Sequence, residues 1–339
     1  MEMKTDNLKE GRAIKRMIVL IICSILIATT GCAKRPEAKP PIKIALNVWP
    51  GDAYAFIAQV KGFFKKNGVE VQLILHKEYM ESQKSYINGV VDGIFEVYAD
   101  TLFHNAEGIL TQVVYVSAFP DTSDVIIGKP EFNSLADLKD RVISIEGINT
   151  FSHIFVLKAI EKAGLKESNI RFKVVPAQGV LNALEDGIID AGHTWDPTKD
   201  RALQKGYKIL SKMGDVPGIV TEVLAFNAKI TRERPKDIQA IVKSILEARD
   251  FLYAHKEEAI KIMAKNEGMS EAEMQEGVSG VHHPDLKENL KAMQKSDETS
   301  SLFGSGKTIA DFYLKRGQLS SLPDLDKIIE PRFVEELGK

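Results

Sequence analysis

The chain has 339 residues, of which 44% are hydrophobic and 27% are charged, and its formal net charge is -2 at pH 7. This length and composition are typical of a globular protein large enough for two hydrophobic cores. The sequence has no block of Lys and Arg and no basic stripe interleaved with aromatic residues, which argues against a nucleic-acid partner.

The first residues are typical of an export signal. Five basic side chains precede the apolar run 17–28, which is too short for a membrane-spanning helix but has the length of a signal-peptide core. The run ends in Ala28-Thr-Thr-Gly-Cys32, which resembles a bacterial lipobox, although Thr29 departs from the usual aliphatic residue. We expect a lipoprotein signal peptide over residues 1–31, cleaved before a lipidated Cys32, with an uncleaved anchor as the alternative.

Residues 32–41 are rich in Lys and Pro, which predicts an extended tether to the membrane. Cys23 would be removed with the signal, so only Cys32 would remain in the mature chain. We therefore expect no disulfide and no cysteine metal site.

From residue 42 onward, apolar strands alternate with helices at spacings that predict parallel sheets. In the first half we expect strands over residues 42–48, 69–75, 91–96 and 111–117, and helices over residues 53–67 and 81–88. In the second half we expect strands over residues 141–145 and 170–175, a helix over residues 151–163, and a helix that ends at Asp186 and leads into a last strand.

One short unit occurs in both halves. Residues 88–94 and 186–192 each contain a glycine at which a helix stops, followed by a short apolar strand. Gly89 and Gly187 stand where the chain must turn left-handed. The repeat predicts two similar lobes, formed by residues 42–122 plus 223–339 and by residues 123–222, with strand ends lining a cleft between them.

Two extended segments, residues 123–128 and 219–226, are predicted to join the lobes as a hinge. The tail from Arg234 is predicted to be helical, to contain no further strand, and to pack on the first lobe. Its expected helices cover residues 235–256, 257–266, 270–279, 285–295, 307–316 and 332–337, with a polar connection over 322–330. His282 and His283 precede a proline and are expected in a surface loop.

The sequence resembles the solute-binding proteins of ABC importers that serve nitrate, alkanesulfonates, taurine and thiamine-pyrimidine precursors. The motifs that carry the resemblance lie at residues 47–51, 61–71, 88–93, 135–143 and 183–191, within a stretch from about residue 42 to 228. The resemblance implies a type II periplasmic-binding fold with the ligand between two lobes, each an α/β unit with a mainly parallel sheet. It does not fix the ligand.

Aromatic residues follow two of the predicted strands. Trp49 and Tyr54 come after the first strand, and an aromatic ring there can stack on a ligand while its polar atom makes a hydrogen bond. Trp195 and Asp196 follow the last strand of the second half and can hold an amine or amidine by cation-π contact and charge. Core packing for the aromatic rings, and helix capping for Asp196, are the alternatives.

Polar groups near two predicted helix starts are further candidates. Asn149, Thr150 and Ser152 lie where free backbone N–H groups attract the oxygen atoms of an anion. Ser82 and Gln83 occupy a comparable place in the first lobe. Simple helix capping explains these residues equally well.

Glu96, Tyr98 and Glu222 complete the candidate list, at strand ends or crossovers. The predicted cleft holds more carboxylates than cations and no Arg on its strand-end loops. This composition favours a ligand with a cationic or ring-nitrogen part over a bare anion. We expect no cofactor and no metal ion.

Together with the family that the sequence resembles, these patterns predict a monomeric substrate-binding lipoprotein of an ABC importer, exported and membrane-tethered, without enzymatic activity. It would bind a small sulfonate or taurine-like, amine-bearing or pyrimidine-like solute by hinge closure and deliver it to membrane permease subunits. A sensor that passes ligand occupancy to a signalling partner is one alternative. A pyrimidine-synthase-like enzyme is another, but the cysteine-rich motif of such enzymes has no counterpart here.

Overall fold

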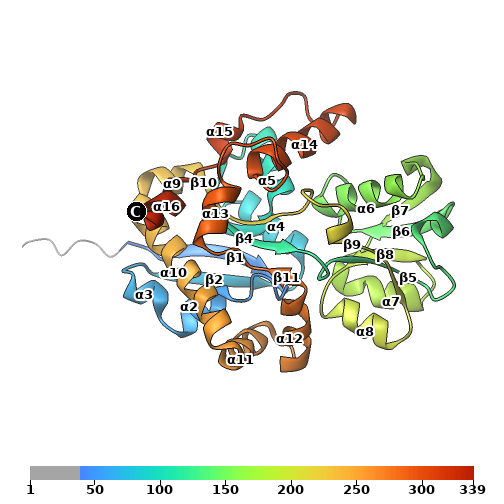
Figure 1. Ribbon diagram of the computed structural model, residues 1–339, viewed down its shortest axis with the longest axis horizontal. Coiled ribbons are helices and arrows are strands. Elements are labelled where there is room, and N and C mark those ends of the chain that lie inside the picture. Colours follow the sequence, from blue (N-terminus) through green and yellow to red (C-terminus); the bar gives the residue numbers. More distant parts are fainter. Residues whose placement is uncertain (1–38) are drawn as a thin grey trace, which may run out of the picture. The chain divides into compact units, whose positions relative to one another are not determined.

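Two β-sheets organise the part of the chain that the computed structural model describes, residues 39–339. The predicted signal peptide and lipidated Cys32 lie outside the described residues, as does most of the predicted tether. Residues 41–339 form one compact unit, and Figure 1 shows its sheets flanked by helices.

The first sheet has six strands in the order β11-β4-β10-β3-β1-β2. These are β1 (Ile42–Asn47), β2 (Val71–His76), β3 (Gly93–Val97), β4 (Thr111–Pro120), β10 (Glu222–Asn227) and β11 (Val281–His282). Strand β1 pairs in parallel with β2 and β3, whereas β10 runs antiparallel to both β3 and β4. Helices cover this sheet, so its strands are apolar runs rather than alternating patterns.

The second sheet has five strands in the order β7-β6-β8-β5-β9. These are β5 (Val125–Gly128), β6 (Arg141–Ile145), β7 (Ile170–Val174), β8 (Ala191–Thr194) and β9 (Lys208–Lys212). Strand β6 pairs in parallel with β7 and β8, and β5 is antiparallel to its neighbours β8 and β9. We call the sheet β1–β4, β10 and β11 with its helices the first lobe, and the sheet β5–β9 with its helices the second lobe.

The helices of the first lobe before the crossover are α2 (Ala55–Val60), α3 (Phe63–Lys66), α4 (Tyr79–Ile87) and α5 (Tyr98–Ala106). The second lobe carries α6 (Phe151–Lys162), α7 (Val180–Glu185) and α8 (Thr198–Gln204). The tail contains α9 (Ala228–Glu233), α10 (Pro235–Ala254), α11 (Lys256–Glu267), α12 (Glu271–Ser279), α13 (Leu286–Ala292), α14 (Leu302–Lys315), α15 (Leu325–Ile328) and α16 (Arg332–Glu335). Within residues 39–339, no helix combines the length and apolar character needed to cross a bilayer.

The repeated unit has the predicted geometry. Gly89 and Gly187 have φ values of 67° and 68°, and they follow the last turns of α4 and α7. The strand after each glycine joins the centre of its sheet, because Gly93 pairs with Ile44 and Ala191 pairs with Ile143. The two-lobed α/β fold and the packing of the tail on the first lobe are confirmed, since α10 packs on α2 and α3 and α14 packs on α5.

Several element predictions were wrong. The helix predicted over residues 53–67 is broken at Gly62, which adopts a left-handed φ of 74° between α2 and α3. Helix α5 and strand β9 were not predicted. Helix α14 begins before residue 307 because the Ser301 hydroxyl accepts a hydrogen bond from the backbone N–H of Phe303 at 3.2 Å. Helix α15 lies within the predicted polar connection.

The tail does contribute a strand, β11, which pairs with the end of β4. As a result, His283 is fully buried rather than on a surface loop, and its Nε2 lies 2.7 Å from the Gly51 carbonyl oxygen. The connections between the lobes are also different from those predicted. Residues 125–128 and 222–226 belong to sheets, so the chain crosses at residues 121–124 and 213–221.

Candidate functional site

A small cavity lies between the two lobes, beyond the carboxyl ends of β1 and β8. Its lining residues are Asn47, Trp49, Asp52, Tyr79, Asp124, Phe151, Trp195 and Glu222. The position agrees with the rule that ligands of open α/β sheets bind outside the carboxyl ends of strands. The cavity volume is only about 10 Å³, close to the least that accommodates one water molecule. The lobes are therefore closed on each other.

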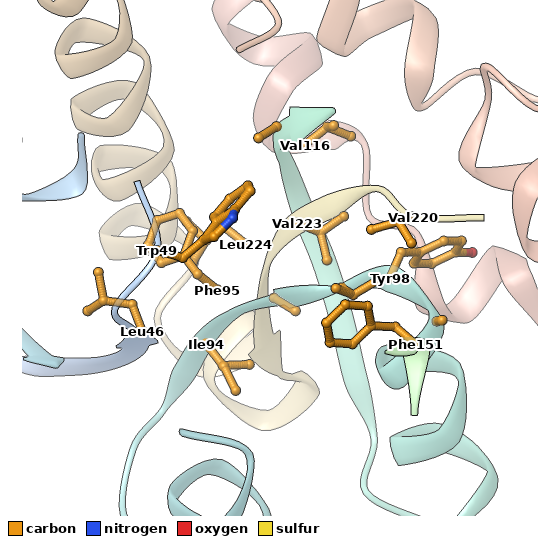
Figure 2. Close-up of a cluster of buried hydrophobic side chains, with 14 of the residues drawn as sticks. Leu46, Trp49, Ile94, Phe95, Tyr98, Val116, Phe151, Val220, Val223 and Leu224 are labelled. Atoms are coloured by element: carbon orange, nitrogen blue, oxygen red, sulfur yellow. The ribbon is translucent and has the colours of Figure 1, made fainter. Parts of the chain in front are cut away.

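Aromatic side chains from both lobes form much of the cavity wall. The Tyr79 and Phe151 rings meet edge to face with their centroids 4.9 Å apart, and the centroid of Trp195 lies 6.2 Å from that of Phe151. The Trp195 Nε1–H donates a hydrogen bond to the Val48 carbonyl oxygen at 3.3 Å, which links the second lobe to the first. Trp49 and Phe151 belong to one buried apolar cluster, part of which is drawn in Figure 2.

Three carboxylates face the same cavity. Burial raises the pKa of Asp52 to about 7, and the nearby charge of Asp124 adds to this shift while the Ser117 hydroxyl opposes it. Burial also raises the pKa of Glu222 well above its usual range, and the charges of Asp52 and Asp124 raise it further. Asp124 accepts a hydrogen bond from the Ser123 hydroxyl at 2.8 Å, and one of its oxygens lies 3.5 Å from His193 Nε2.

The amino terminus of α6 is occupied by a carboxylate of the protein itself. The Phe151 backbone N–H donates to Asp100 Oδ1 at 3.3 Å, and the Tyr79 hydroxyl donates to Asp100 Oδ2 at 2.5 Å. Burial raises the pKa of Asp100 to about 7 despite the Tyr79 hydrogen bond. The helix end that was expected to attract an external anion therefore already faces an internal acid.

A second cavity, of about 370 Å³, lies beside the first. It is lined by Met80, Gln83, Ile87, Asp100, Phe103, His104, Glu107, Ile109, Asn149 and Thr150. Most of these residues come from α4 and α5 of the first lobe, and two come from the second lobe. We call the cavity beside Trp49 the inner cavity and this one the outer cavity.

The predicted site residues divide among these two cavities and their surroundings. Trp49, Trp195 and Glu222 line the inner cavity, and Gln83, Asn149 and Thr150 line the outer one. The remaining six, Tyr54, Ser82, Glu96, Tyr98, Ser152 and Asp196, line neither cavity.

Hydrogen bonds and ion pairs inside the protein occupy most of those six. The Tyr54 hydroxyl donates to the Ser117 carbonyl oxygen, and the Ser82 hydroxyl donates to that of Tyr79. Ser152 Oγ lies 2.9 Å from His193 Nδ1, and Asp196 forms an ion pair with Lys199 at 2.7 Å.

Glu96 accepts hydrogen bonds from Gln83 and Thr101, and its Oε2 lies 3.4 Å from His104 Nδ1. The buried Tyr98 hydroxyl has no hydrogen-bond partner among the described residues.

The candidate list lacked five residues of the inner cavity, Asn47, Asp52, Tyr79, Asp124 and Phe151, of which Asp124 lies within the predicted hinge segment 123–128. Asn47 and Asp52 lie within the same strand-end segment as Trp49, so their proximity to it in the chain was a usable signal. Tyr79 and Phe151 are the first residues of α4 and α6. Their direction toward the cavity depends on how the lobes close, which the sequence does not encode locally.

Comparison with known proteins gives matches along most of the chain. The model of the family described as "NMT1/THI5 like" matches residues 49–259. The "Putative thiamine biosynthesis protein" of Haemophilus influenzae is 28% identical over 233 residues, which cover 66% of this chain and 72% of that protein.

Two solved structures share the fold. The periplasmic aliphatic sulphonate binding protein SsuA of Escherichia coli superimposes with a TM-score of 0.70 at 17% identity, covering 87% of this chain and 93% of SsuA. The periplasmic nitrate-binding protein NrtA of Synechocystis superimposes with a TM-score of 0.72 at 13% identity, covering 87% of each chain. The fold is thus that of periplasmic binding proteins, and with the family match over residues 49–259 the chain belongs to the NMT1/THI5-like family.

Proposed function

We propose that this protein is the substrate-binding component of an ABC importer and that its solute is a small organic cation, such as an amine, an amidine or a protonated aminopyrimidine. The observation that carries the proposal is the inner cavity, in which three carboxylates and four aromatic rings converge. Among the described residues that line it, none is Lys or Arg.

The chemistry of the lining favours a cation. Aromatic faces attract cations through their quadrupole, and a buried carboxylate is stabilised by a partner of opposite charge. Without such a partner, Asp52 and Glu222 keep their protons to higher pH, as their raised pKa values indicate. A cationic solute would supply the missing countercharge.

The same lining disfavours sulfonate and nitrate. Anion sites use basic side chains or free N–H groups at a helix start. Here the amino terminus of α6 faces Asp100, and the adjoining acids would repel a second negative charge. On this proposal the protein differs in ligand charge from relatives named for sulphonate or nitrate binding.

The proposed mechanism is hinge closure without chemical turnover. The chain crosses between the lobes twice, which allows one lobe to rotate relative to the other while the two stay aligned. Closure would bury the solute between Trp49 of the first lobe and Trp195 of the second. The closed form would then dock on the permease, and Cys32 would tether the exported monomer to a membrane.

The test is calorimetric titration of the purified protein, unfolded and refolded beforehand to remove any bound solute. Butylamine, benzamidine and 4-aminopyrimidine serve as cationic or ring-nitrogen probes, and taurine, methanesulfonate and nitrate as the competing classes. We expect binding only in the first group. Asp52→Asn and Glu222→Gln should each weaken it at least about tenfold, because removing one partner of a buried charge pair costs a few kcal/mol.

Asp297→Asn is the matched control, since this acid is exposed and lines neither cavity, and it should leave the affinity unchanged. Tight binding of an anion with no binding of the cationic probes would overturn the proposed ligand class.

A further inference from the structure

The outer cavity is much larger than the inner one, although the two are neighbours in the same interlobe space. Its volume of about 370 Å³ falls within the range of ordinary small-molecule sites, whereas the inner cavity of about 10 Å³ holds no more than one water molecule. An organic solute therefore does not fit the inner cavity alone in this closed form.

A thin wall of three residues separates the cavities. Tyr79 and Phe151 line the inner cavity, and Asp100, which binds the Tyr79 hydroxyl and the Phe151 N–H, lines the outer one. Asp100 and Tyr79 belong to the first lobe and Phe151 to the second. The wall therefore depends on contact between the lobes, where Phe151 meets Tyr79 and Asp100.

Most polar side chains of the outer cavity have partners elsewhere in the protein. Gln83 Nε2 donates to Glu96, His104 lies 3.4 Å from Glu96, and both Asp100 oxygens accept hydrogen bonds. The Thr150 hydroxyl donates to the Gly147 carbonyl oxygen, and Asn149 Oδ1 accepts a hydrogen bond from Gln318 Nε2.

The surface left for a ligand is mainly apolar, from Met80, Ile87, Phe103 and Ile109. This cavity suits a hydrocarbon group rather than a second charge, because apolar area gains free energy on leaving water.

We propose that the outer cavity is a second subsite of the cleft, which takes the apolar chain or ring of a solute whose cationic end lies in the inner cavity. The inference rests on the proposed function and adds to it the shape of the solute: a cationic head and an apolar body of several carbons that crosses the position of the wall. Asp100 would then face the ligand at the junction of the two subsites.

The test uses the homologous series ethylamine, butylamine and hexylamine, titrated calorimetrically into the purified protein. Each added methylene that enters the subsite should raise the affinity about fourfold. Ile87→Trp places a large side chain at a partly exposed position of the outer cavity, so it should be tolerated by the fold. It should lower the affinity for hexylamine at least about tenfold and leave that for ethylamine within about twofold.

Val90→Trp is the matched control, because Val90 is exposed just after the same helix and lines neither cavity. It should change neither affinity, and Met80→Trp, at a partly buried position, should reproduce the effect of Ile87→Trp. Equal affinities along the series, or an unaltered response to hexylamine in both outer-cavity variants, would overturn the subsite while leaving a cation site in place. If none of the three amines binds, the proposed function fails and the subsite with it.

Discussion

Several buried acids lie near the cleft, and Glu267 shows how the burial of one acid affects the stability of the protein. It is buried beneath Trp49, whose backbone N–H donates to Oε1 at 3.3 Å, while Oε2 has no hydrogen-bond partner among the described residues. Burial raises the pKa of Glu267 to about 8, although the Trp49 hydrogen bond opposes the shift and the charge of Asp52 adds to it. The folded protein therefore holds a proton that the unfolded chain releases near pH 4.5.

The difference in proton binding between the folded and unfolded states sets the sign with which the free energy of unfolding changes with pH. A group whose pKa is raised by folding stabilises the protein fully below its unfolded pKa, and this stabilisation is lost as the pH rises through the folded pKa. Glu267 thus lowers the free energy of unfolding by up to about 1.4 kcal/mol per pH unit between roughly pH 5 and pH 8. Glu267→Gln removes the titration and should flatten the decline by that amount.

Urea unfolding at pH 5.5, 6.5 and 7.5 measures the effect. The exposed Glu276→Gln on the neighbouring helix is the control and should keep the wild-type slope. An identical slope in Glu267→Gln would show that Glu267 titrates normally in the folded state. His153 and His283, whose pKa values burial lowers to about 4, act in the opposite direction below about pH 6.5, so the interval above that pH is the most informative.

At the scale of elements, two ion pairs join the tail helices of the first lobe to the second lobe. Arg316, at the end of α14, pairs with Glu167 at 2.6 Å, just before β7. Arg201 of α8 pairs with Glu273 of α12 at 2.7 Å. Both pairs lie across the interface between the lobes, so each is lost when the lobes separate.

We predict that Arg201→Gln and Arg316→Gln each speed ligand release by up to about fivefold. Partly exposed ion pairs contribute about 0.2–1 kcal/mol, and that amount would be withdrawn from the closed form alone. Stopped-flow dissociation of butylamine, followed by tryptophan fluorescence, measures the rate. Lys205→Gln breaks an ion pair with Glu185 inside the second lobe and should leave the rate unchanged. Equal release rates in all three variants would exclude a role for the rim pairs in closure.

At the scale of the whole molecule, repulsion between buried acids opposes closure of the lobes. Asp52 and Glu222 of the first lobe meet Asp124 of the interlobe connection in a cavity with almost no space for water. Bringing like charges together out of water is unfavourable, so closure without a ligand requires protonation of some of these acids. A cation would remove that requirement.

We therefore predict that the ligand-free protein is more compact at pH 5.5 than at pH 8. Small-angle X-ray scattering should show a smaller radius of gyration at the lower pH, because the raised pKa of Asp52 lies between the two values. Saturating butylamine at pH 8 should restore the compact form. The variant Asp52→Asn, Glu222→Gln should remain compact at both pH values, and a radius of gyration unaffected by pH and ligand would contradict this account.

The repeated glycine units show how much the sequence determines by itself. Gly89 and Gly187 predict helix ends because a left-handed turn favours glycine, and the apolar runs after them predict central strands. Local rules of this kind were enough for the two-lobed α/β architecture. They also placed Trp49 and Trp195 at strand ends, where both line the inner cavity.

Only the tertiary structure decided which polar groups face the cavities. The carboxylate Asp100 reaches the amino terminus of α6 from another lobe, 51 residues away in sequence, so the predicted anion site could not be judged from residues 149–152 alone. Strand β11 escaped prediction for a similar reason, since two residues acquire strand pairing only through contact with β4. Short-range patterns follow from the preferences of neighbouring residues, whereas the charge and size of the cleft depend on side chains that meet only when both lobes have folded and closed.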